Sequence, residues 1–274
     1  MMQYDVVAKL LLEIGRDSIL RSFLGIEAEG AELILDVPPE TVSTRSADFA
    51  LRLRAGGSER IVLLEMQTRW EPEKPRVMVE YRARFQTKYP GVEVDPFMVL
   101  FQADARAVDV YRDKYLTFRF HLVKLWELEA ARHLESGVGI LPFIPLMRGG
   151  LETTLEAERR IYAAPMPPVV RADLLTALAV LTGLQDRQLA KELLGRRRDI
   201  MIESPVYDMI KDEGKLEGKI EGKLEGKREG QIEGKREGKI EVAAAMVGEG
   251  TPLATVLRLT GLTEGDLRAG GLIA

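Results

Sequence analysis

Hydrophobic and polar positions along the chain predict one helix followed by a series of strands. Residues 4–24 place apolar side chains about one helical turn apart, and Gly25 is a typical helix end. An amphipathic pattern predicts a further helix at residues 76–89. Short apolar or alternating runs predict strands at residues 31–37, 47–54, 60–67, 97–102 and 116–123.

The second half of the chain has the hydrophobic pattern of helices. Such patterns occur at residues 125–134, 151–162 and 169–201. Gly183 and Gly195 are predicted to interrupt the last of these helices. A strand-rich first half followed by helices predicts an α/β fold, with a mixed sheet flanked by helices and an all-helical C-terminal extension. We expect a globular domain at residues 1–150 and a helical extension at residues 151–210.

Residues 211–240 form a low-complexity repeat of Glu, Gly and Lys or Arg. Seven glycines recur at every fourth position from Gly214 to Gly238. Each costs roughly 1 kcal/mol relative to alanine inside a helix, and like charges face each other one turn apart. We expect an exposed, marginal helix that can fray into a solvated tether. The alternative is that the glycines let two chains approach closely and pair.

Residues 241–274 return to an ordinary sequence and predict a small helical unit. Thr251-Pro252 is a good helix start for residues 253–259, and Thr263 begins a final short helix. Two short helices around this turn resemble half of a helix-turn-helix. The simpler interpretation is a helical cap, because no basic recognition face accompanies the pair.

Composition narrows the classes of function that the chain can have. The chain has 274 residues, a net charge of −4 and a sequence pI near 5.5, so any contact with DNA must come from a local cluster of Arg and Lys. The absence of cysteine excludes disulfides, zinc–thiolate sites and cysteine nucleophiles, and it fits a reducing compartment. His121 and His133 are the only histidines, so we expect neither a histidine-rich metal site nor a histidine-dependent triad.

The sequence shows no signal peptide or transmembrane segment. Asp5, Lys9 and Glu13 interrupt the first apolar run, and the apolar stretch at residues 140–147 is too short to span a bilayer. We therefore expect a cytoplasmic protein without a membrane partner.

Candidate chemistry is concentrated at residues 46–67, which read as two strands joined by a short turn. Alternate residues of a strand share a face, so Glu65 and Gln67 lie on the face of Ile61 and Leu63. A carboxylate that emerges from a hydrophobic strand is costly to bury without a partner, and a divalent cation is a natural one. Asp48 on the preceding strand could supply a second carboxylate.

Two carboxylates can bind Mg²⁺, or Mn²⁺ or Ca²⁺ in its place, and Mg²⁺ activates a bound water and stabilises charge on a phosphate. Gln67 could orient that water by hydrogen bonding, but it brings no positive charge. Arg69, Lys74 and Arg76 are close in sequence and could meet phosphate oxygens. The alternative interpretation is that Asp48 simply begins a strand while Glu65 and Gln67 lie at a solvated strand end.

These residues resemble the glutamine variant of the PD-(D/E)XK nuclease core, and more narrowly the Rpn-type recombination-promoting nuclease and YhgA-like transposase family. The resemblance covers nearly the whole chain. It rests on the helix with Tyr4, Asp5 and Lys9, on Asp48 and Glu65-x-Gln67, on the helix with Arg76 and Tyr81, on residues 141–146, and on the glycine–acid–base repeats before a small helical unit.

The resemblance implies a restriction-endonuclease-like fold and Mg²⁺-dependent hydrolysis of DNA phosphodiester bonds. Asp48 and Glu65 would be the metal ligands, and Gln67 would take the usual lysine position. Ala47 stands where the wider motif has proline. Arg69, which is close in sequence to Lys74 and Arg76, would support the site rather than perform the chemistry.

Asp5 and Lys9 match the family pattern loosely and can also be interpreted as a surface ion pair worth about 0.3–0.5 kcal/mol. Arg76 and Tyr81 are five residues apart, where the family pattern places the arginine one turn before the tyrosine. All four are support residues in this interpretation.

Three functional hypotheses follow. The first is a metal-dependent DNA endonuclease that acts in recombination or within a mobile element. The second is a nuclease fold without activity that binds DNA or protein, which the acidic pI and the absence of lysine at position 67 leave open. The third is a structural protein organised by its repeats. A double-strand cut would need two sites, so the first hypothesis also predicts a homodimer.

Overall fold

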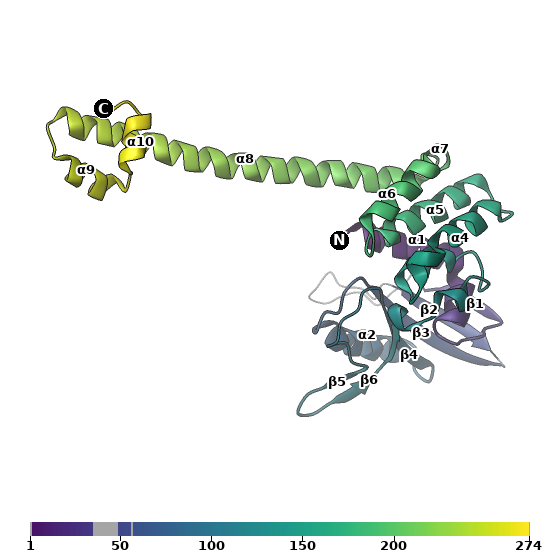
Figure 1. Ribbon diagram of the computed structural model, residues 1–274. Coiled ribbons are helices and arrows are strands. Elements are labelled where there is room, and N and C mark those ends of the chain that lie inside the picture. Colours follow the sequence, from purple (N-terminus) through teal and green to yellow (C-terminus); the bar gives the residue numbers. More distant parts are fainter. Residues whose placement is uncertain (1, 35–48, 56, 274) are drawn as a thin grey trace. The chain divides into compact units, whose positions relative to one another are not determined.

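The computed structural model describes residues 2–34, 49–55 and 57–273 of the chain (Figure 1). The chain divides into two compact units, Met1–Ile210 and Lys211–Ala274. The first unit contains the mixed sheet and most of the helices. The second contains the C-terminal helices.

A five-stranded mixed sheet forms the centre of the first unit. Its strands are arranged in the order β1 (Gly30–Leu33), β2 (Phe49–Ala55), β3 (Ser58–Gln67), β4 (Glu93–Leu100) and β7 (His121–Lys124). The pairs β1–β2 and β2–β3 are antiparallel, whereas β3–β4 and β4–β7 are parallel. Parallel neighbours need a crossover, and α2 (Lys74–Lys88) supplies it between β3 and β4.

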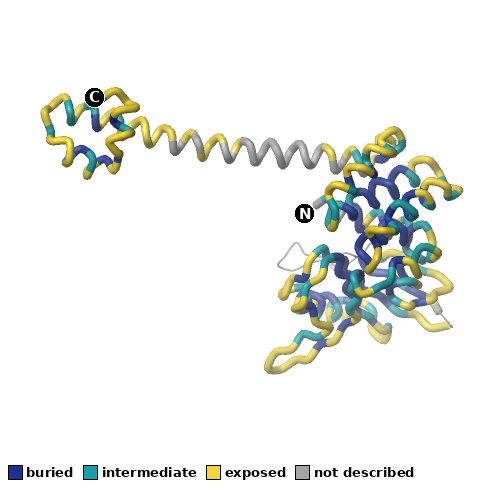
Figure 2. Tube along the Cα trace, in the orientation of Figure 1, coloured by how far each residue is buried: buried dark blue, intermediate teal, exposed yellow. Residues whose placement is uncertain are grey.

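Strand β3 is buried on both faces. Its successive side chains point alternately to the two sides of the sheet, as the sequence predicts. Val62, Leu64 and Met66 join the core formed with α1 (Met2–Ser22) and α5 (Pro168–Thr182). Ile61 and Leu63 pack instead against α2. Figure 2 shows buried residues concentrated where the sheet meets these helices. Glu65 therefore faces α2.

The strand predicted at residues 116–123 is two strands that belong to different sheets. β6 (Thr117–Arg119) pairs with β5 (Val110–Arg112) in a two-stranded hairpin, while β7 pairs with β4 in the main sheet. The sequence prediction was wrong here because alternation continues across Phe120 while the hydrogen-bonding partner changes. The amide of Phe120 donates to the carbonyl of Asp109, beyond the hairpin ladder.

Two helical predictions also need correction. Residues 125–134 form two short pieces, the 3₁₀ helix η1 (Leu125–Glu127) and α3 (Ala130–His133). The interruption predicted at Gly195 falls two residues later, at Arg197, between α6 (Arg187–Arg196) and the short helix that begins at Arg198. Gly183, in contrast, is the C-cap of α5 as predicted.

The remaining helices of the first unit pack around a buried, proline-containing segment. This segment is the 3₁₀ helix η2 (Leu141–Leu146), whose six residues are all buried. α4 (Gly150–Ala163), α5 and the short α7 (Arg198–Met201) complete this part of the unit. Gly15 of α1 and Gly139 before η2 approach so closely that a Cβ on Gly139 would lie 2.3 Å from the Cα of Gly15.

The repeat segment is helical and belongs to α8 (Pro205–Gly248). Its described side chains from Gly226 to Lys239 are exposed, in agreement with the prediction of an exposed helix. Whether this helix frays into a tether or pairs with a second chain stays a prediction.

The second unit has a small core of its own. Ala243, Val256, Leu262 and Leu267 are buried together where the end of α8 meets α9 (Leu253–Thr260) and α10 (Glu264–Ala269). Thr263 caps α10 through a capping box with Asp266, so the predicted helix start at Thr263 is confirmed. Among the helices of the described residues, none has the length and apolar character that crossing a membrane requires.

Candidate functional site

Glu65 is a buried acid near the end of β3. Its side chain is only 3% exposed, although it follows an apolar run that could have ended in solvent. The alternative interpretation of Glu65 as a solvated strand-end residue is therefore wrong. Because burial strips water from a carboxylate, the fold has to supply hydrogen-bond donors in its place.

Two donors meet on one oxygen of this carboxylate. The Lys74 Nζ lies 2.5 Å from the Glu65 Oε1, and the Gln67 Nε2 donates to the same oxygen at 2.9 Å. Gln67 can do so because it shares the strand face of Glu65. Lys74 can do so because α2 begins with it, directly after the loop that follows β3, and Pro75 fixes the first turn of that helix. The positive charge of the Lys74 ammonium compensates the negative charge of the buried carboxylate.

The site residues predicted from sequence are only partly brought together. Asp48 lies outside the described residues, and so does the side chain of Asp5, so neither the second carboxylate nor the Asp5–Lys9 pair is described. Tyr81 is buried and lines the same small cavity as Glu65. Arg76 is exposed and pairs with Glu80 on its own helix, at 3.5 Å.

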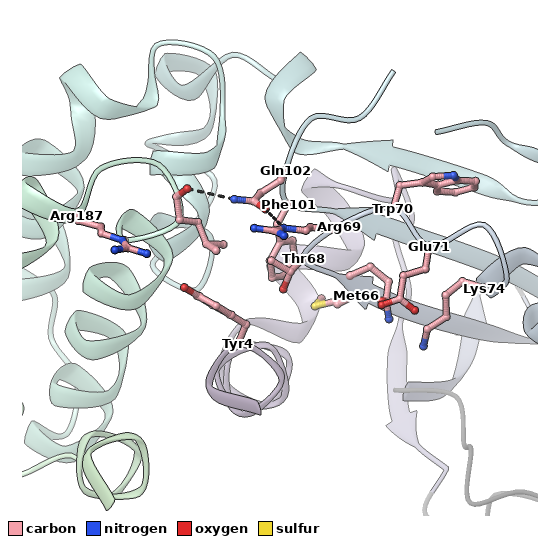
Figure 3. Close-up of a pocket in the computed structure, with 13 residues that line it drawn as sticks. Tyr4, Met66, Thr68, Arg69, Trp70, Glu71, Lys74, Phe101, Gln102 and Arg187 are labelled. Atoms are coloured by element: carbon pink, nitrogen blue, oxygen red, sulfur yellow. Dashed lines mark hydrogen bonds between the residues drawn. The ribbon is translucent and has the colours of Figure 1, made fainter. Parts of the chain in front are cut away.

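A pocket of about 650 Å³ opens beside the Glu65–Lys74 pair. Figure 3 shows its walls, which come from the end of β3 and the following loop, from Tyr4 of α1, and from the junction of α5 with α6. Gln67 and Lys74 line the pocket as well as binding Glu65. The pocket is lined by three cationic side chains, Arg69, Lys74 and Arg187, and by one acid, Glu71.

A chain of hydrogen bonds fixes the wall of this pocket. The Arg69 Nε donates to the Gln102 Oε1 at 2.9 Å, and the Gln102 Nε2 donates to the carbonyl of Leu184 at 3.2 Å (Figure 3). This chain connects the loop after β3 with the end of β4 and with the helices of the second half of the unit. It therefore holds the Arg69 guanidinium in one place at the pocket wall.

Comparisons with protein-family models, with curated proteins and with solved structures gave no match.

Sequence reasoning missed several residues of this pocket. Gln102 lies two residues after the end of β4, and Arg187 follows the N-cap of a helix, Asp186, but neither belongs to a motif. For Lys74, the sequence predicted only a contact with phosphate oxygens. No local signal connects it with Glu65, because the pairing depends on how α2 packs against the sheet.

Two side chains of this site carry the oxygen atoms that a hard divalent cation binds. Glu65 offers a carboxylate and Gln67 an amide oxygen on the same strand face, and oxygen ligands are what Mg²⁺, Mn²⁺ and Ca²⁺ prefer. Within the described ranges, no three acidic, histidine or cysteine side chains come together as a metal-binding group. The second carboxylate that the sequence suggests, Asp48, lies outside those ranges.

Proposed function

We propose that the chain is a metal-dependent DNA endonuclease with a restriction-endonuclease-like fold, related to the Rpn-type nucleases that its sequence resembles. One observation carries the proposal: a buried acid, Glu65, is paired with Lys74 and Gln67 at the wall of a pocket that contains further arginines. A mixed five-stranded sheet flanked by helices is compatible with that fold.

The residues of the chain have separate roles in this proposal. Asp48 and Glu65 would hold the metal. When bound, the metal would lower the pKa of a water molecule and stabilise charge on a phosphate oxygen. Gln67 would orient the attacking water through its side-chain amide. Lys74 supplies the positive charge that Gln67 lacks, so it would stabilise the extra negative charge of the transition state.

The pairing of Lys74 with Glu65 also favours a second candidate function. An ion pair satisfies the buried carboxylate without any metal, as it would in a nuclease fold that binds DNA or protein without cutting. The two functions differ in whether the charged pair takes part in chemistry or only stabilises the fold.

Plasmid cleavage separates the two functions. Purified protein is incubated with supercoiled plasmid and Mg²⁺, Mn²⁺ or Ca²⁺, beside the variants Asp48→Asn, Glu65→Gln and Lys74→Met. The matched controls are Glu152→Gln on α4 and Lys88→Met on α2, which change exposed residues outside the site. We expect nicking that depends on the cation, is lost in the three site variants and is retained in both controls.

Two results would contradict the endonuclease. Cleavage that persists in Glu65→Gln and Asp48→Asn would remove these residues from the site. Binding of plasmid by the wild-type protein without cleavage in any of the three cations would favour the binding module.

A further inference from the structure

We infer that Arg69 and Arg187 hold a backbone phosphate next to the one that is cut, so that the substrate is a polynucleotide strand continuing through the pocket. This inference rests on the proposed function, since it extends the same site from one phosphate to two. It assigns a binding role to Arg187, for which the sequence offered no motif.

Arg69 is held in place for a ligand. It is exposed, and its Nε is already bound to Gln102, which is bound in turn to the carbonyl of Leu184. Within the described part of the chain, the two terminal nitrogens of its guanidinium make no hydrogen bond. A guanidinium that is fixed through Nε presents its outer nitrogens in a defined direction, which suits bidentate contact with a phosphate.

Arg187 reaches the same pocket from the opposite wall. It is the first residue of α6, and the Asp186 side chain caps that helix by accepting from the amides of Gln188 and Leu189. Figure 3 shows the guanidinium groups of Arg187 and Arg69 pointing toward each other across the pocket, with Tyr4 below them. Two facing cations repel each other, and an anion between them would turn this repulsion into attraction.

The location of the pocket explains why the anion would be a neighbouring phosphate rather than the cleaved one. Lys74 and Gln67 line the same pocket as Arg187, and Glu65 lies buried directly behind them, bound to both. A volume of about 650 Å³ is in the general range of small-ligand pockets. A strand that places one phosphate at Glu65 and Lys74 can therefore place the next at Arg69 and Arg187.

DNA binding without divalent cations tests this inference apart from catalysis. A fluorescein-labelled 20-base-pair duplex is titrated with wild-type protein, Arg69→Gln, Arg187→Gln and the double variant in EDTA, at several salt concentrations. Arg159→Gln, an exposed arginine on α4, is the matched control. Thermal melting of each variant confirms that it is folded.

We expect each pocket variant to weaken binding about 10-fold and to reduce the slope of log K against log salt by about 1, because one phosphate contact is lost. Both arginines contact the same phosphate, so the double variant should reduce the slope by about 1 in total rather than 2. Arg159→Gln should bind as the wild type does. With Mg²⁺, the pocket variants should raise KM for cleavage and leave kcat nearly unchanged.

The outcomes distinguish this inference from the proposed function. If the wild type cuts DNA while Arg69→Gln and Arg187→Gln keep its affinity and salt slope, the phosphate site is wrong and the nuclease stands. If binding depends on both arginines but no divalent cation supports cutting, the phosphate site stands and the nuclease fails. A wild-type protein that neither binds nor cuts DNA overturns both.

Discussion

The Lys74 ammonium lies 2.5 Å from the Glu65 carboxylate, although the two residues are nine positions apart in sequence. Glu65 ends an apolar face of β3, and Lys74 begins the helix that covers this face. The sheet and the helix thus bring opposite charges together at the pocket wall. This pair is where the protein concentrates its candidate chemistry.

The charge of Lys74 should matter more for activity than its length. We predict that Lys74→Met lowers kcat for plasmid cleavage by about 10²-fold, the usual effect of removing one group that stabilises transition-state charge. Lys74→Arg keeps the charge and should retain more activity than Lys74→Met. The measurement is initial nicking rate at saturating plasmid. Equal rates for wild type and Lys74→Met would leave Lys74 a purely structural role.

A second buried ion pair connects the helices of the first unit. Glu158 of α4 is completely buried, and Arg197 donates to one of its oxygens while stacking over the Tyr162 ring at 4.0 Å. We predict that Arg197→Met destabilises the protein by about 3 kcal/mol, because it leaves a buried charge without a partner. Urea unfolding gives the value.

The double variant Glu158→Met/Arg197→Met is the matched control for this pair. It removes both charges, so it should recover most of the lost stability. A double variant as unstable as Arg197→Met would show that packing around Tyr162, rather than charge, is responsible.

Two glycines should respond to alanine in opposite directions. A Cβ at Gly139 would meet the backbone of Gly15 at 2.3 Å, so Gly139→Ala should destabilise the protein by about 3 kcal/mol through overpacking. Gly195 lies in the exposed part of α6 with nothing within 4 Å of its Cβ position. Gly195→Ala should therefore stabilise the protein by about 0.5 kcal/mol. Shifts of the same sign in urea unfolding would contradict this prediction.

The stability of the second unit should depend on pH through Asp266. Hydrogen bonds from the Thr263 hydroxyl and amide, followed by the Arg236 guanidinium, lower the pKa of Asp266 from its ordinary value of 3.8 to about 2. Because the pKa is lowered in the folded state, Asp266 stabilises the unit above pH 3.8, and this contribution is lost as the pH falls toward 2. We expect an NMR titration of the carboxyl carbon to give a midpoint near 2.

Asp266→Asn is the control for the pH dependence. This variant should lose the decrease in stability that protonation of Asp266 causes. The dependence of its stability on pH should otherwise match that of the wild type. A titration midpoint near 3.8 in the wild-type protein would mean that the capping box does not hold the carboxylate in solution.

The molecular mass of the protein in solution shows whether the repeat helix pairs two chains. A double-strand cut needs two sites, so we predict a full-length homodimer. If the glycine positions of α8 pair the chains, a version ending at Ile210, where the first unit ends, should be a monomer by light scattering. Equal numbers of chains in both versions would clear the repeats of any role in assembly and favour the tether.

Sequence by itself determined the features that depend on neighbours along the chain. The two faces of β3, the end of α5 at Gly183 and the capped start of α10 at Thr263 all follow from residue spacing and local hydrogen bonding. It also singled out Glu65 and Gln67, because a polar pair interrupts an apolar strand.

Tertiary structure decided which charges meet and where the strands change partners. Lys74 reaches Glu65, and Arg187 faces Arg69, only because α2 and α6 pack where they do. The break at Phe120 between two sheets leaves no mark on the hydrophobic alternation. Periodicity records which face of an element is apolar, whereas the partner of that face is chosen by packing over long separations, which no local pattern encodes.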